Sequence, residues 1–245
     1  MQFVMMLLLI PTYWKSKADC EMGYWKKKHA QESANRRSPS MENAPYRTTF
    51  TQPFRLATSF FRDKKVLDVG CGPRGSLEFL TGVARATVCV DPLALNYSTL
   101  GAWSHSMVYV SGGIESLPLA SNSFDVVSSI NNFDHVEDAG RGLAEVYRVL
   151  RPGGVFMLAV EIHPKPTKCE PLSLGWDFER TIGAAGLQPH LTRFWLNPKG
   201  VSHSLANTMW NEESVGRGLI DQMVRDGSIA DRTGWFVGIF NKSRL

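Results

Sequence analysis

Short apolar runs alternate with amphipathic stretches along most of the chain after residue 62. Glycine, proline, asparagine or aspartate bounds most of these runs, which is typical of buried strands in a parallel sheet. The runs predict strands near residues 65–69, 86–91, 107–110, 124–130 and 154–161. The stretches between and after them predict helices near residues 75–82, 93–101, 138–150 and 174–185. Because strands and helices alternate, we expect a doubly wound α/β fold, with a mostly parallel sheet and helices on both faces.

Two more strands and one helix are predicted near the end of the chain. Leu187–Leu196 has the pattern of a sixth strand, with Pro189 at its entrance, and Gly234–Phe240 that of a seventh. Residues 197–233 form a long connection between them, in which residues 212–226 carry apolar side chains at helical spacing. Two interpretations of this helix stay open: packing against the core, or a flap on the substrate side.

The strongest chemical signal lies where the first predicted strand ends. Residues 66–75 read Val-Leu-Asp-Val-Gly-Cys-Gly-Pro-Arg-Gly, an apolar strand that runs into a glycine-rich turn. Glycine lets a backbone approach a ligand closely, and the amide end of a helix beginning near Ser76 is expected to face that ligand. About twenty residues later, the second strand ends at Asp91, where a carboxylate accepts hydrogen bonds from ribose hydroxyls. This part of the chain therefore predicts a nucleoside-binding βαβ unit.

Two nucleoside cofactors fit this pattern. Gly70, Gly72 and Gly75 satisfy the G-x-G-x-x-G pattern of dinucleotide-binding proteins, so an NAD-dependent oxidoreductase is one alternative. Asp68, however, stands two residues before the first glycine, where a carboxylate repels a pyrophosphate and attracts the ammonium group of an amino-acid moiety. The acidic residue favours a cofactor that carries an amino acid.

Four pieces of the chain resemble the class I S-adenosylmethionine-dependent methyltransferases, and in particular the type 11 members of that family. They are Leu67-Asp68-Val69-Gly70-Cys71-Gly72, Asp91, Ser123-Phe124-Asp125-Val126-Val127, and Glu145-Val146-Tyr147-Arg148-Val149-Leu150-Arg151-Pro152-Gly153-Gly154. They occur in the family's order, and the resemblance is close over roughly residues 62–165. It implies a Rossmann-like seven-stranded sheet whose last strand is antiparallel and lies beside the fifth. It also implies an enzyme that transfers a methyl group from S-adenosylmethionine to a small-molecule acceptor by in-line displacement.

The resemblance further implies which residues bind the cofactor. They are Arg47, Asp68, Gly70, Cys71, Gly72, Gly75, Asp91, Pro92, Ile114, Glu115 and Asn131. Asp68 would hold the amino-acid end, Arg47 the carboxylate and Asp91 the ribose. Gly113 stands where similar methyltransferases carry an Asp that binds the adenine amino group, so adenine recognition is expected from Glu115 or from the backbone of residues 114–115. This departure also keeps a non-catalytic S-adenosylmethionine-binding protein as an alternative.

Two histidines are the candidate proton acceptors. His135 lies in the loop after the fourth strand, where a methyl acceptor would sit, and His163 follows the fifth strand. A base is needed if the acceptor is a hydroxyl or a protonated amine. A purely structural packing role for His135 is the alternative. We expect no metal site, because His105, His190 and His203 show no clustering in the sequence.

Residues 1–62 precede the core and are expected to form a separate appendage, with residues 63–245 as the methyltransferase domain. The appendage has ten Lys and Arg against four Asp and Glu, and aromatic residues such as Trp25 that suggest a lid. A surplus of this size is typical of a solvated surface, so a nucleic-acid partner is not favoured. The apolar run Phe3–Ile10 is shorter than a membrane span and lacks the flanks of a signal peptide. Met22 is an alternative start, and the sequence does not predict an oligomeric state.

The four cysteines show no C-x-x-C pair and no metal-ligand spacing; they are Cys20, Cys71, Cys89 and Cys169. We therefore expect four free thiols and a cytoplasmic location.

Overall fold

A computed structural model describes residues 12–33, 41, 43–167, 169–199, 204 and 213–244 of the 245-residue chain. Of the sequence predictions, those for the apolar run at residues 3–10 and for His203 lie outside these ranges, as does part of the 197–233 connection. None of the helices among the described residues is long and apolar enough to cross a membrane.

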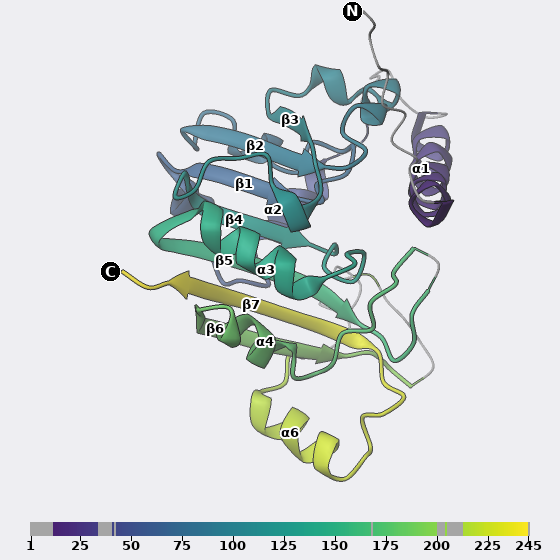
Figure 1. Ribbon diagram of the computed structural model, residues 1–245, viewed down its shortest axis with the longest axis vertical. Helices are drawn as coiled ribbons and strands as arrows, with labels where there is room; N and C mark the ends of the chain where they lie inside the picture. The colour runs from purple at the N-terminus through teal and green to yellow at the C-terminus, as the bar shows by residue number, and fades with distance from the viewer. Residues whose placement is uncertain are drawn as a thin grey trace, which may run out of the picture.

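One seven-stranded sheet forms the centre of the molecule (Figure 1). Its strand order is β3-β2-β1-β4-β5-β7-β6. The first five strands pair in parallel, and β7 pairs antiparallel with both β5 and β6. The strands are β1 (Lys65–Val69), β2 (Ala86–Asp91), β3 (Val108–Ser111), β4 (Phe124–Ile130), β5 (Leu150–Ile162), β6 (Leu187–Leu196) and β7 (Gly234–Lys242). The predicted fold class is confirmed, including the antiparallel last strand beside β5.

Within the described residues, five helices and five short 3₁₀ segments surround the sheet. The helices are α1 (Thr12–Ser33), α2 (Ala44–Thr51), α3 (Ala139–Val149), α4 (Phe178–Ala184) and α6 (Arg217–Arg225). The 3₁₀ turns are η1 (Thr58–Phe61), η2 (Glu78–Leu80), η3 (Asn96–Leu100), η4 (Ala102–Ser104) and η5 (Ile114–Ser116).

The helices predicted at residues 75–82 and 93–101 are wrong, because only the turns η2 and η3 form there. Gly75 and Gly82, with φ of 68° and 75°, lie at the two ends of the first segment. Gly101, with φ of 84°, ends the second. Left-handed glycines stop a helix at these positions. In the described part of the chain, no α-helix therefore begins at the glycine turn, contrary to the prediction.

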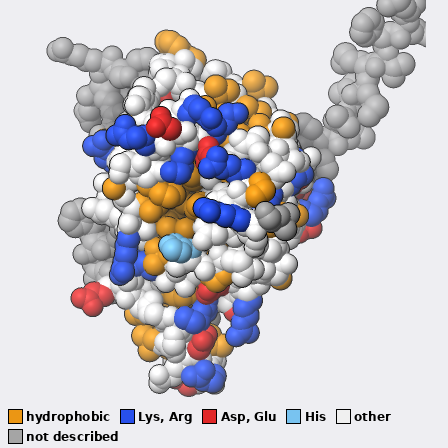
Figure 2. Space-filling model, turned by 90° about the vertical axis from the view of Figure 1, so that its left-hand side faces the viewer, with side chains coloured by type: hydrophobic (Ala, Val, Ile, Leu, Met, Phe, Trp, Pro, Cys, Tyr) orange, Lys and Arg blue, Asp and Glu red, His pale blue; other side chains and the backbone are white. Residues whose placement is uncertain are grey.

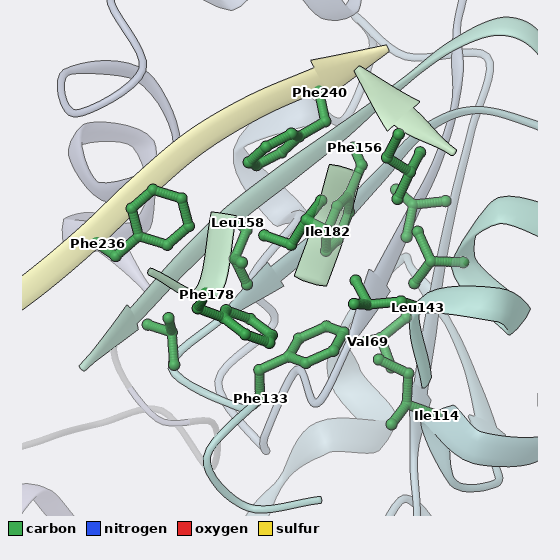
Figure 3. Packing of buried hydrophobic residues seen from close by; sticks show 14 of the residues in the cluster. Val69, Ile114, Phe133, Leu143, Phe156, Leu158, Phe178, Ile182, Phe236 and Phe240 are labelled. Carbon is green, nitrogen blue, oxygen red and sulfur yellow. The ribbon is translucent and has the colours of Figure 1, made fainter. Parts of the chain in front are cut away.

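Both faces of the sheet are buried. On one face, aromatic and aliphatic side chains from the strands pack against α3, α4 and α6 (Figure 3). The Phe133 ring lies between those of Phe156 and Phe178, and its centroid is 5.9 Å from the centroid of each. On the other face, Phe50 of α2 and Phe61 of η1 pack against Phe79. This two-sided burial explains why the central strands are almost continuously apolar.

Polar residues of the Glu145–Gly154 motif hold the loop before β4 in place. Arg148 donates to the carbonyls of Leu117 and Leu119 at 2.9 and 2.8 Å, and Glu145 accepts from the backbone N–H of Leu117 at 2.7 Å. Arg148 and Glu145 also bind each other. The motif thus fixes the segment that begins with η5, and this structural role needs no ligand.

The prediction of four free thiols is wrong. Cys20 pairs with Cys169 and Cys71 pairs with Cys89 in two disulfides. Cys20 and Cys169 are 149 residues apart in the chain, and Cys71 and Cys89 are 18 residues apart, so neither pair has the C-x-x-C spacing that would have predicted a disulfide. The first disulfide joins α1 to the loop after β5, and the second joins the glycine turn to β2.

Candidate functional site

A cavity of about 360 Å³ opens where the parallel strands end. Its wall comes from the turn after β1, the ends of β2 and β3, the loop after β4, the loop after β5, and α1, which lies beside these strand ends (Figure 1). The lining residues include Lys17, Glu21, Tyr24, Trp25, Gly70, Gly72, Asp91, Pro92, Tyr97, Gly113, Ile114, Glu115, Asn131, Asn132, His135 and Glu170. Its volume falls in the range of small-ligand sites, roughly 300–1,000 Å³.

The opposite end of the molecule, where the parallel strands begin, carries many Lys and Arg side chains around hydrophobic ones (Figure 2). Among the described residues, Lys17 is the one Lys or Arg that lines the cavity. The basic surface therefore lies away from the site.

The glycine turn is shaped for close contact with other groups. Gly70 and Gly72 have φ of 74° and 61°, values that L side chains rarely adopt. A Cβ on Gly70 would lie within 2.6 Å of the Asn132 side chain, and one on Gly72 would lie 2.9 Å from the Trp25 ring. Glycine at both positions leaves room for the cavity and its aromatic cover.

Asp91 lies at the end of β2 with its carboxylate in the cavity wall. It accepts from the backbone N–H groups of Gly72 and Leu93 at 3.1 and 2.9 Å, and from the Tyr97 hydroxyl. Burial raises the pKa of Asp91 above its ordinary value, against the lowering effect of these donors. The carboxylate is fixed in place and can accept further hydrogen bonds from a ligand.

The η5 turn supplies the wall next to Asp91. Ile114 is buried, and Glu115 accepts from the backbone N–H of Glu137 at 2.8 Å. Gly113 offers no side chain, so Glu115 is the carboxylate of this turn that borders the cavity.

Asp68 does not line the cavity. Only 2% of it is exposed, and its two oxygens accept from the hydroxyls of Ser76 at 2.5 Å and Ser128 at 2.7 Å. Burial raises the pKa of Asp68 to about 7, although both hydroxyls lower it. This position behind the glycine turn does not support the predicted direct contact with an ammonium group.

Four other predicted residues also lie outside the cavity lining. Cys71 is in a disulfide, and the Gly75 N–H donates to the Tyr109 hydroxyl at 3.1 Å. Arg47 is exposed on α2, and His163 is buried behind the loop after β4. The predicted Gly70, Gly72, Asp91, Pro92, Ile114, Glu115, Asn131 and His135 do line it.

Sequence reasoning missed most of the α1 contribution and the loop after β5. Lys17, Glu21 and Glu170 line the cavity, yet they belong to no motif. The aromatic residues of α1 were the one signal, since they suggested a lid. The Cys20–Cys169 disulfide brings Glu21 and Glu170 together, because each follows one of the paired cysteines.

A cluster of charged groups borders the cavity at the loop after β4. His135 Nδ1 lies 2.7 Å from Glu21 Oε1, and its Nε2 lies 3.8 Å from Asp134 Oδ1. His163 Nε2 lies 3.7 Å from Asp134 Oδ2. Burial lowers the pKa of His135, but Glu21 and Asp134 outweigh it, so the pKa is raised; the pKa of His163 is raised mainly by Asp134.

Comparison with known proteins agrees with this arrangement. The family model of the methyltransferase domain matches residues 67–158. The probable phthiotriol/phenolphthiotriol dimycocerosates methyltransferase 2 of Mycobacterium ulcerans is 32% identical over 160 residues, which cover 64% of this chain and 58% of that relative. The chain thus spans less than two thirds of this curated relative.

Solved structures show the same fold at low identity. A phosphoethanolamine N-methyltransferase 2 of Haemonchus contortus in complex with S-adenosyl-L-methionine has a TM-score of 0.57 at 15% identity, over 81% of this chain and 52% of that one. The [4+2]-cyclase SpnF has a TM-score of 0.53 at 16% identity, over 81% of each chain.

Proposed function

We propose, from the premise that this chain belongs to the class I S-adenosylmethionine-dependent methyltransferases, that it methylates a small molecule bound beside the β4 loop. When bound, S-adenosylmethionine supplies a methyl group on a sulfonium and leaves as a neutral thioether. The reaction then depends on alignment of the acceptor and on exclusion of water more than on strong acids.

The observation that best supports this proposal is the position of Asp91. A buried carboxylate, fixed by two backbone donors at the end of β2, fits the two hydroxyls of a ribose. The left-handed Gly70 and Gly72 keep the adjacent turn free of side chains, so that the cofactor can approach the backbone. Ile114, Glu115 and Asn131 line the same cavity, which supports adenine binding by the first two and contact of Asn131 with the amino-acid end.

Helix α1 is proposed to act as the lid. Trp25 covers the glycine turn and Lys17 reaches the backbone carbonyl of His135, so α1 spans the cavity from the cofactor side to the acceptor side. A cover of this kind excludes water from the reacting atoms. If the acceptor loses a proton, His135 is the imidazole on the cavity wall that can receive it.

Two further points concern the size of the methyl acceptor and the cellular compartment. The cavity of about 360 Å³ has to hold the cofactor as well, so it leaves room only for a small acceptor. The sequence predicted a cytoplasmic location from four free thiols, whereas the two disulfides of this structure are more typical of an oxidising compartment.

Calorimetric titration tests the cofactor proposal. Wild-type protein is titrated with S-adenosylmethionine, S-adenosylhomocysteine and NADH, and we expect binding of the two adenosyl compounds alone. Asp91→Asn keeps the shape of the side chain but removes its charge, so affinity should fall by roughly 1.5–3 kcal/mol. Asp231→Asn, an acid outside the cavity lining, should bind like wild type. Unchanged affinity in Asp91→Asn would refute the ribose assignment.

A second candidate function is cofactor binding without catalysis, because position 113 is a glycine where the family carries an adenine-binding carboxylate. A non-catalytic protein would bind S-adenosylmethionine without turnover. Formation of S-adenosylhomocysteine with a panel of hydroxyl, amine and carboxylate acceptors separates the two functions.

A further inference from the structure

The Asp134 carboxylate is completely buried, yet neither of its oxygens has a hydrogen-bond donor among the described residues. An unpartnered buried carboxylate is costly, so a positive group is needed beside it. The nearest nitrogens are His135 Nε2 at 3.8 Å and His163 Nε2 at 3.7 Å, both beyond hydrogen-bonding distance.

His135 is oriented as metal-ligating histidines are. Its Nδ1 lies 2.7 Å from Glu21 Oε1, so the proton of the neutral ring is best placed on this nitrogen. In the neutral ring, Nε2 then presents a lone pair towards Asp134 Oδ1. Two lone pairs that face each other across 3.8 Å repel, and either a proton on Nε2 or a metal cation between them removes the repulsion. A carboxylate behind the distal nitrogen is the usual support of a ligating histidine.

Glu170 completes a three-residue group. Its carboxylate, the Asp134 carboxylate and one nitrogen of His135 lie within 4.8 Å of one another. Ligand atoms on a tetrahedral ion with bonds of about 2.1 Å lie roughly 3.4 Å apart. Glu170 is partly exposed on a loop and can make the small movement required, with Thr167 donating to its Oε2 at 2.9 Å.

We propose that Asp134, His135 and Glu170 bind a divalent cation of the zinc type on the acceptor side of the cavity. Mixed imidazole and carboxylate ligands favour zinc and similar transition metals over magnesium. The carboxylates of Glu21, Glu115, Glu137 and Asp134 lie near the Lys17 ammonium, and Glu170 adds another carboxylate to the cluster, a balance that attracts a dication. This differs from the sequence prediction of no metal, which considered other histidines.

The site has an open position. His135 and Glu170 line the cavity, so three protein ligands leave a coordination place that faces the acceptor. An acceptor hydroxyl bound there would lose its proton more easily, and His135 would then be a ligand instead of a base. The cation site does not rest on the methyl-transfer proposal, because its argument uses the cluster alone.

Metal titration of the full chain tests this site. Protein without an affinity tag is treated with a chelator, dialysed, and titrated with ZnCl₂ in a calorimeter, while metal content is measured by mass spectrometry. We expect one zinc per chain, and binding at least tenfold weaker in Glu170→Gln, which lies on a loop and should fold. Glu21→Gln should weaken binding roughly 10–100-fold through the orientation of His135. Glu137→Gln, an exposed acid two residues from His135, is the matched control and should bind like wild type.

Cobalt gives a second readout. Co²⁺ in place of zinc should give visible absorption bands of a tetrahedral nitrogen and oxygen site in wild type and in Glu137→Gln, and much weaker bands in Glu170→Gln. Absence of a one-to-one zinc complex, or equal zinc affinity in wild type and Glu170→Gln, would overturn the proposal and leave the cluster as ion pairs alone.

Discussion

Two aspartates at the ends of neighbouring strands have different environments. Asp91 borders the cavity and accepts from backbone N–H groups, whereas Asp68 lies behind the glycine turn between two serine hydroxyls. The motif identified both residues, but it did not distinguish a ligand-facing carboxylate from a buried one. The two carboxylates lie on different sides of the glycine turn. Ser76 and Ser128 hold the Asp68 carboxylate on the side away from the cavity, because both hydroxyls donate to it.

The raised pKa of Asp68 predicts that the stability of the protein depends on pH. Because burial raises its folded-state pKa from 3.8 to about 7, the native state binds more protons than the unfolded state between about pH 4 and pH 7. The free energy of unfolding of the ligand-free protein should therefore fall as pH rises through that window, by an amount on the order of a few kcal/mol. Asp68→Asn should lose less stability than wild type between pH 5 and pH 8 in urea denaturation.

Ser76→Ala provides a second check on the same carboxylate. It removes a donor that lowers the pKa of Asp68, so the loss of stability should move to higher pH. Parallel stability curves for wild type and Asp68→Asn from pH 5 to pH 8 would contradict the assignment.

The element that defines the site most clearly is α1. Met22 and Trp25 pack against a small hydrophobic cluster that includes Tyr97 and Leu100. The helix is also held by the Cys20–Cys169 disulfide and the Glu32–Arg74 ion pair. The Arg74 guanidinium also lies 5.8 Å from the centre of the Trp25 ring. A helix attached in this way can open without disturbing the sheet.

Loss of the α1 disulfide should loosen that helix alone. In Cys20→Ser/Cys169→Ser, amide hydrogen exchange in residues 20–33 is expected to accelerate at least tenfold, because the covalent link to the loop after β5 is lost. Amides of β5 serve as the internal reference and should be unchanged. Equal protection of α1 in wild type and in the double variant would show that the disulfide does not hold the lid.

Sequence patterns predicted strands better than helices. Each predicted strand overlaps an observed one, because buried parallel strands appear as dense apolar runs between turn residues. The helix predictions at residues 75–82 and 93–101 failed because left-handed glycines end those segments after one 3₁₀ turn. Propensity alone did not indicate which glycines adopt a positive φ.

At the scale of the whole molecule, the order of four motifs along the chain was enough to predict the sheet topology. It was not enough to predict which residues line the cavity. The cavity joins residues from Lys17 to Glu170, and the acceptor end depends on contacts between α1 and two distant loops. Such contacts have no periodicity and no fixed spacing in the sequence. The part of the cavity wall at Gly70, Gly72 and Asp91 was therefore predictable, and the Glu21–His135–Asp134 cluster was not.

A crystal structure with S-adenosylhomocysteine bound is the most direct test of the central claim, which is that the cavity at the strand ends is the cofactor site. We predict both ribose hydroxyls within about 3 Å of the Asp91 carboxylate, the adenine beside Ile114 and Glu115, and Trp25 over the ligand. A ligand bound elsewhere, or one whose ribose does not contact Asp91, would contradict the account.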